Sequence, residues 1–116
     1  MNPLNYGSRE ACEKLFKAGI VLKTEFWWNK DETGKYYLIP YEKCHRNDGL
    51  QVLQVTPAVS MAEAWGELPP NTMIRKFGSD TWVWITDKED STRHNINPAD
   101  ALIELRIWLE RRKDEN

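Results

Sequence analysis

The stretch NPADALIELRIWL, residues 97–109, decides the fold of this chain of 116 residues. Asn97 is a favourable N-cap, and Pro98 suits the first helical position, where its missing N–H costs nothing. The apolar residues that follow have helical spacing, and Ile103 and Ile107 widen their stripe beyond one face. We therefore predict a helix that ends near Lys113 and is covered on more than one side. Its buried stripe comprises Ala101, Leu102, Leu105, Trp108 and Leu109.

Two shorter helices precede this one. The sequence SMAE at residues 60–63 matches a capping box, in which the serine and glutamate side chains bond each other's backbone amides. This helix should run to about Leu68, because the prolines at residues 69–70 disfavour the α region before them. Nearer the N-terminus, Ser8 is a good N-cap and Gly19 stands at a natural helix stop.

Between the helices, β-branched and aromatic residues gather in short runs bounded by polar turns. These runs predict strands at about residues 21–29, 35–42, 50–55, 73–77 and 81–86. Pro40 cannot donate a backbone hydrogen bond, so the second strand should lie at a sheet edge or break there. Residues 88–96 have the composition of a polar loop.

The order of elements is helix, three strands, helix, two strands, helix, which predicts one α+β domain over residues 1–116. We expect a single antiparallel sheet of about five strands with three helices packed on it. Helical cover on both faces of that sheet would explain strands whose apolar residues point both ways, such as residues 26–28 and 82–85.

The composition is that of a soluble globular domain, with 41% hydrophobic and 29% charged residues. The formal net charge of −2 argues against a general nucleic-acid binder, which normally carries a basic excess. No apolar run approaches the length of a membrane span, and residues 1–9 lack the pattern of a secretory signal. We therefore expect a cytoplasmic protein that does not bind membranes.

Signatures of metal binding, cofactor binding and catalysis are weak. The soft ligands Cys12, Cys44, His45 and His94 form none of the spacings of zinc sites, and the glycine motifs that bind phosphate are absent from the sequence. We expect no metal, no cofactor and no catalytic residue, with both cysteines as free thiols. A thiolate pair of Cys44 with His94 is the enzyme alternative.

Six tryptophans distinguish the chain from an average small domain. Trp82 and Trp84 are two residues apart and must share one strand face, whereas the adjacent Trp27 and Trp28 must point to opposite faces. We predict that one of Trp27 and Trp28 is largely buried, and that the other is partly exposed or lies in an interface. The aromatic and cationic residues of the two hairpins make up the predicted binding surface: Trp27, Trp28, Tyr37, Tyr41, His45, Arg46, Arg75, Trp82 and Trp84.

Three segments of the chain carry a resemblance. SREACEKLFKAGI at residues 8–20, TPAVSMAEAWGELP at residues 56–69 and NPADALIELRIWL at residues 97–109 resemble a group of small proteins encoded by phages, prophages and other mobile elements of gut bacteria. The resemblance spans most of the chain, and its motifs are helix caps and core positions. It implies a shared fold and a mobile-element origin, and it assigns no catalytic residue.

These patterns favour a small non-enzymatic binding protein that presents an aromatic surface to a protein partner of host or phage. The first hairpin should carry that surface, and self-association as a homodimer through the same region is an open alternative. A further alternative is a binder or sponge for a nucleotide-like ligand that stacks on tryptophan.

Overall fold

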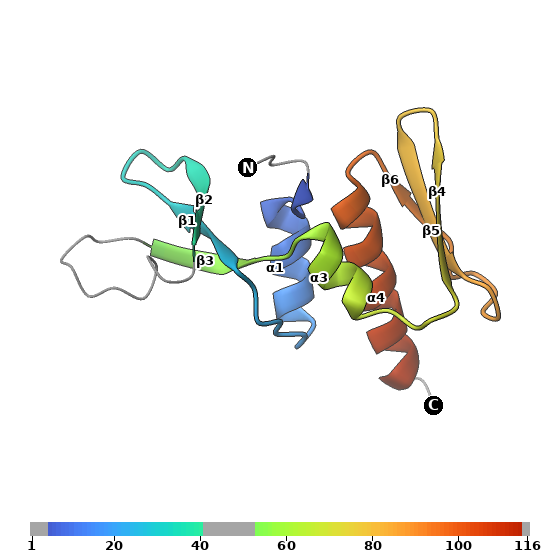
Figure 1. Ribbon diagram of the computed structural model, residues 1–116. Helices are drawn as coiled ribbons and strands as arrows, with labels where there is room; N and C mark the ends of the chain where they lie inside the picture. The colour runs from blue at the N-terminus through green and yellow to red at the C-terminus, as the bar shows by residue number, and fades with distance from the viewer. Residues whose placement is uncertain (1–4, 41–52, 115–116) are drawn as a thin grey trace.

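The computed structural model describes residues 5–40 and 53–114. Those residues form an α+β fold of three helices and six strands, as the sequence predicts for the class (Figure 1). The helices are α1 (Arg9–Lys17), α3 (Met61–Gly66) and α4 (Pro98–Asp114), and the strands are β1 (Phe26–Lys30), β2 (Tyr36–Pro40), β3 (Leu53–Ala58), β4 (Thr72–Phe77), β5 (Asp80–Ile85) and β6 (Arg93–Asn95). Within this part of the chain, no helix combines the length and the apolarity that a bilayer crossing requires.

Each helix begins at the cap that the sequence predicts. The Ser8 hydroxyl accepts a hydrogen bond of 3.2 Å from an amide in the first turn of α1. The Ser60 hydroxyl and the Glu63 carboxylate accept from each other's backbone amides at 3.1 and 2.9 Å, which completes the capping box of α3. Asn97 Oδ1 accepts from two amides in the first turn of α4, at 2.9 and 3.3 Å. These bonds satisfy amides that no helical carbonyl can reach.

The expected single sheet is wrong, because the six described strands form two separate three-stranded antiparallel sheets. The first sheet has the order β2-β1-β3, and the second has the order β4-β5-β6. Figure 1 shows the two sheets on opposite sides of the helices, with α4 next to the second sheet. The physical reason is the wide apolar surface of α4, which needs cover on two sides and therefore separates the hairpins.

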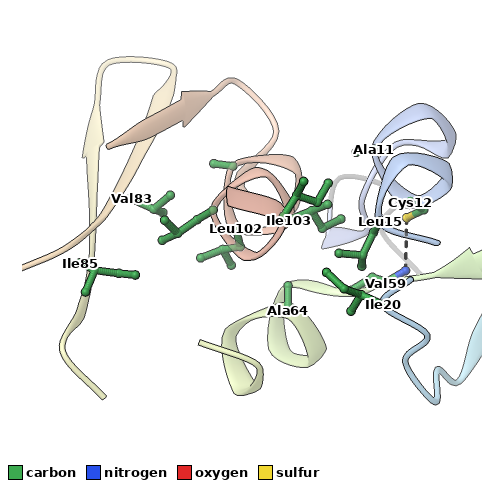
Figure 2. Packing of buried hydrophobic residues seen from close by; sticks show 13 residues of the cluster. Ala11, Cys12, Leu15, Ile20, Val59, Ala64, Val83, Ile85, Leu102 and Ile103 are labelled. Atoms are coloured by element: carbon green, nitrogen blue, oxygen red, sulfur yellow. Dashed lines mark hydrogen bonds between the residues drawn. The ribbon is translucent and has the colours of Figure 1, made fainter. Parts of the chain in front are cut away.

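α4 lies at the centre of the hydrophobic core. Figure 2 shows Leu102 on the side of α4 that faces β5, where Val83 and Ile85 point towards it. Ile103, the next residue, lies on the side that faces α1. All four side chains are almost completely buried. The prediction that this helix is covered on more than one side is confirmed.

Trp108 lies at the margin of this core rather than inside it. Leu105 is fully buried, whereas the Trp108 indole is partly exposed. The centroid of the indole lies 4.9 Å from the guanidinium carbon of Arg112 and 5.7 Å from that of Arg93. The predicted stripe of α4 is therefore tightly buried at its beginning and looser towards the end of the helix.

Gly7 joins the first sheet to the helices. Its amide donates to the Val59 carbonyl oxygen at 2.8 Å, and its carbonyl oxygen accepts from Trp28 Nε1 at 3.1 Å. The backbone passes so close to α4 that a methyl group on Gly7 would overlap the side chain of Ile103. Any larger residue at this position would force the buried Ile103 side chain to shift.

The strand bounds differ from the prediction in three places, one of which is β3, whose end lies at Ala58 rather than near residue 55. β1 begins at Phe26 rather than near residue 21, and β6 lies where we expected a polar loop. Ser91 explains β6, because its hydroxyl accepts from the Ile85 amide and can donate to the Lys88 carbonyl oxygen, both at 2.9 Å. These bonds fold the chain back, so that β6 pairs with β5. β2 lies at the edge of the first sheet among the described strands, as predicted, and its described part runs to Pro40; the predicted strand residues 41–42 and 50–52 lie outside the described residues.

Candidate binding surface

The second sheet has one covered face and one open face. Along β5, the buried residues Thr81, Val83 and Ile85 alternate with Trp82 and Trp84, which are partly exposed. Because successive side chains of a strand point to opposite faces and the buried set faces α4, both tryptophans lie on the face away from α4. The helical cover that we expected on both faces is therefore present on only one face among the described elements (Figure 1).

Strand register adds residues of β4 and β6 to the open face. Met73 lies opposite Trp84, and both Arg75 and His94 lie opposite Trp82, on its two sides. Residues directly opposite each other in an antiparallel pair share a face, and Phe77 follows Arg75 at a spacing of two. We call this surface the outer face, and its members are Met73, Arg75, Phe77, Trp82, Trp84 and His94.

Contacts between aromatic side chains fix the arrangement of residues on the outer face. The Trp82 ring stacks on the His94 ring with centroids 4.6 Å apart and planes inclined by 15°. It also meets the Phe77 ring edge to face, at a centroid distance of 5.9 Å. The guanidinium carbon of Arg75 lies 4.8 Å from the centroid of the Phe77 ring, and His94 Nδ1 lies 3.6 Å from Asp80 Oδ2. These contacts hold the rings relative to one another across three strands.

The outer face exposes apolar surface of the kind that interfaces use. Met73 is 45% exposed and Phe77 is 50% exposed, next to the partly exposed Trp82 and Trp84. Contiguous exposed apolar patches on small proteins mark sites of interaction, and tryptophan, methionine and arginine are enriched in protein interfaces. The outer face is therefore the strongest candidate site in the described residues.

The first sheet distributes its predicted surface residues over two faces. Trp28 packs against the core and donates to the Gly7 carbonyl oxygen, whereas Trp27 points to the opposite face of β1. Tyr37 shares the face of Trp27, because it lies opposite Asn29 in the register. Both indoles are partly buried, and Trp28 is the one that packs against the core cluster. Tyr41, His45 and Arg46 lie outside the described residues.

The predicted binding residues do not form one surface. Trp27, Trp28 and Tyr37 belong to the first sheet, whereas Arg75, Trp82 and Trp84 belong to the second. The helices lie between the two sheets (Figure 1). The structure therefore places all of the second group on one face, whereas in the first group only Trp27 and Tyr37 share a face.

Sequence reasoning misses three members of the outer face: Met73, Phe77 and His94. Met73 and Phe77 could have been predicted from the sequence, because residues 73, 75 and 77 alternate along a strand that pairs with the strand of the two tryptophans. His94 could not, because its strand depends on the turn that Ser91 holds and on no local pattern of its own.

An apolar pocket lies beside the inner face of β4, between α3 and α4. Met61, Ala62, Trp65, Ile74 and Leu102 line it, and its volume is about 250 Å³. Two of these side chains are large and well exposed, since Trp65 is 43% and Ile74 is 40% exposed. Ile74 points to the face of β4 opposite that of Met73, so the pocket and the outer face flank the same strand.

The described residues hold little reactive chemistry. Cys12 is buried, and the Val59 amide donates to its Sγ at 3.4 Å (Figure 2). Burial raises the pKa of the Cys12 thiol to about 11, so the thiol is protonated and inert at neutral pH. Within residues 5–40 and 53–114, no three His, Cys, Asp or Glu side chains are placed to hold a metal ion. Cys44, the proposed partner of His94, lies outside the described residues.

No protein-family model matches the chain, and comparisons with curated proteins and with solved structures give no match either.

Proposed function

We propose that this protein is a non-enzymatic binding module that engages a protein partner through the outer face of the second sheet. The observation that carries the proposal is the exposed Phe77 ring in contact with the partly exposed Trp82, with the partly exposed Trp84 on the same sheet face, which no described element covers. Aromatic anchors of this kind dominate the binding energy of protein interfaces. The resemblance to mobile-element proteins makes a host or phage protein the partner that we propose.

The charges around the rings favour an acidic partner surface. Arg75 lies within the ring cluster on the outer face, Lys76 lies on the opposite face of the same strand, and β4 contains no acidic residue. Asp80, at the end of the face, has His94 as a neighbour at 3.6 Å. A partner that places carboxylates beside apolar side chains would complement this arrangement.

The geometry favours a protein over a nucleotide-like ligand. Small ligands occupy concave sites that bury most of their surface, whereas the outer face is one side of an open sheet. A stacking ligand also needs a free ring face, and His94 already occupies one face of Trp82. A broad protein surface needs neither a concave site nor a free ring face.

Peptides selected on the immobilised full chain from a random display library would test the proposal. Affinities would be compared for the wild type, Phe77→Ala and the matched control Phe16→Ala. Phe16 is 44% exposed on α1, so it has similar exposure but lies away from the outer face. We expect Phe77→Ala to weaken binding by about tenfold, as for an interface hot spot, and Phe16→Ala to leave it unchanged. Equal affinities of all three proteins would contradict the proposal.

Titration with nucleoside mono-, di- and triphosphates, followed by tryptophan fluorescence, tests the alternative ligand class. We expect no saturable change. Saturable quenching that disappears in Trp84→Ala would overturn the proposal in favour of a stacking small ligand.

A further inference from the structure

β4 is the outer strand of the second sheet, and one of its edges has no neighbouring strand among the described residues. The β4–β5 hairpin closes through a two-residue turn that starts at Gly78, whose φ is 59°. In such hairpins the closing pair, here Phe77 with Asp80, is hydrogen bonded, and bonded pairs then alternate with unbonded ones. Ile74 and Lys76 therefore direct their backbone N–H and C=O groups away from β5, towards the open edge.

A strand added at this edge would meet a different surface on each face. On the outer face, its side chains would lie beside Arg75 and Phe77, where the guanidinium group and the ring are 4.8 Å apart. On the inner face, they would reach the apolar pocket of about 250 Å³ at Ile74 and Trp65. Strand addition uses main-chain hydrogen bonds for affinity and side-chain pockets for specificity, and this edge offers both.

The charges of β4 indicate which kind of segment could pair with its open edge. Arg75 and Lys76 are adjacent, so each face of the strand carries one cation, and the strand has no carboxylate. Opposite charges on facing strands stabilise a pair, and like charges destabilise it. A second copy of this chain, paired through its own β4, would bring the cations of both copies into one ribbon. An acidic segment of a different protein fits, whereas self-pairing at this edge does not.

We infer that the β4 edge binds an extended acidic segment of a partner protein as a fourth strand of the second sheet. Alternate side chains of that segment are acidic on the side of Arg75 and apolar on the side of the pocket. This inference rests on the proposed function, because it specifies how part of the partner reaches the outer face.

The probe is a capped peptide of about eight residues that alternates glutamate and valine, long enough to pair along all of β4. Its control replaces every glutamate by lysine. Amide hydrogen exchange of the full-length protein, followed by nuclear magnetic resonance, would report on the edge directly. We expect the acidic peptide to slow exchange of the Ile74 and Lys76 amides by at least about tenfold at saturation, as new hydrogen bonds require. The basic peptide should leave both amides unchanged.

Two substitutions at Lys76 separate the charge from the backbone hydrogen bond. Lys76→Gln removes only the charge, whereas Lys76→Pro removes both the charge and the N–H that faces the edge. Proline is tolerated at edge positions whose N–H is not used in the sheet, and circular dichroism melts would check that the variant folds. We expect Lys76→Gln to change the affinity for the acidic peptide little, because the Lys76 side chain lies on the pocket side, where the peptide is apolar, and we expect Lys76→Pro to weaken the affinity at least about tenfold. Equal affinities of the two variants would contradict strand addition.

The outcomes separate this inference from the proposed function. Failure of the acidic peptide to bind the wild type would overturn the inference. Binding of the display-selected peptides to the wild type and to Phe77→Ala tests the proposed function of the outer face separately. The acidic peptide could also bind in a way that Phe77→Ala abolishes, without slowing amide exchange at Ile74 and Lys76. That result would overturn strand addition but would still support binding at the outer face. Equal binding of the basic peptide overturns the assignment of an acidic occupant.

Discussion

Trp82 and His94 stack across β5 and β6, with ring centroids 4.6 Å apart and planes inclined by 15°. The stack forms because the register places the two residues directly opposite each other on the outer face. It ties the shortest strand of the sheet to the ring cluster. β5 thus presents Val83 and Ile85 to α4, while the three strands together carry an ordered aromatic face on the opposite side.

Neighbouring residues of β5 should differ sharply in their contribution to stability. Ile85 is 1% exposed and faces α4, whereas Trp84 lies on the outer face. We expect Ile85→Ala to lower the free energy of unfolding by about 2–5 kcal/mol, as for other truncations in a packed core. Trp84→Ala should cost only about 1 kcal/mol, since its indole keeps part of its solvent contact in the folded state. Urea unfolding would measure both, and similar losses would mean that the outer face is not open.

Two glycines provide a matched test of the packing around α4. A methyl group at Gly7 would overlap Ile103, whereas a methyl group at Gly66 meets nothing within 4 Å. Gly7→Ala should therefore destabilise the protein by about 1–3 kcal/mol through overpacking. Gly66→Ala, at the end of α3, should be neutral or stabilise it by up to about 1 kcal/mol through helix propensity. Thermal melts of the two variants that shift by the same amount would contradict the close approach at Gly7.

The link between the starts of α1 and α4 also has a measurable energy. The Ser8 amide donates to Asp100 Oδ1 at 2.6 Å, and the Asp100 side chain is almost completely buried. We expect Asp100→Ala to cost about 2 kcal/mol, because it removes a hydrogen bond to a charged group and leaves an amide without a partner. Glu104→Ala, one turn further along α4, serves as the control and should cost about 0.5 kcal/mol. Denaturant midpoints that do not separate these variants would refute the link.

Local features of the chain were predictable because short-range chemistry determines them. The caps at Ser8, Ser60 and Asn97 satisfy amides within a few residues of themselves, so the sequence contains both partners. The widened apolar stripe of α4 likewise predicted its cover on two sides. The number of sheets was not predictable in this way, because it depends on which hairpin packs on which side of α4.

The site was predictable only in part for the same reason. The alternation along β5 placed Trp82 and Trp84 on one face, but whether that face lay inside or outside depended on tertiary packing. The adjacent Trp27 and Trp28 led to the prediction that the first hairpin carries the binding surface, but Trp28 makes a structural hydrogen bond to Gly7. His94 entered the face through a strand that Ser91 creates by bonding backbone groups six and three residues away.

Cys12 should react with thiol reagents only when the protein unfolds. Burial raises its pKa from 9.0 to about 11, so the folded protein keeps the thiol protonated where the unfolded chain ionises it. Stability should therefore be fully present below pH 9 and decline as the pH rises from about 9 to about 11, by about 3 kcal/mol in total for this group. A Cys44→Ser variant leaves Cys12 as the one thiol for the reactivity assay. Cys12→Ala should reduce the loss of stability between about pH 9 and about pH 11. Rapid labelling of the native protein at pH 8 would be inconsistent with this burial.

The indole N–H signals of the tryptophans test the central claim most directly. Assigned by single Trp→Phe substitutions, they report on both sheets in one spectrum as a display-selected peptide is titrated into the full-length protein. The account predicts shifts at Trp82 and Trp84 on the outer face, with the Trp28 signal unchanged because its Nε1 bonds Gly7 away from that face. Shifts confined to Trp27 and Trp28 would contradict the account and would place the binding surface on the first hairpin.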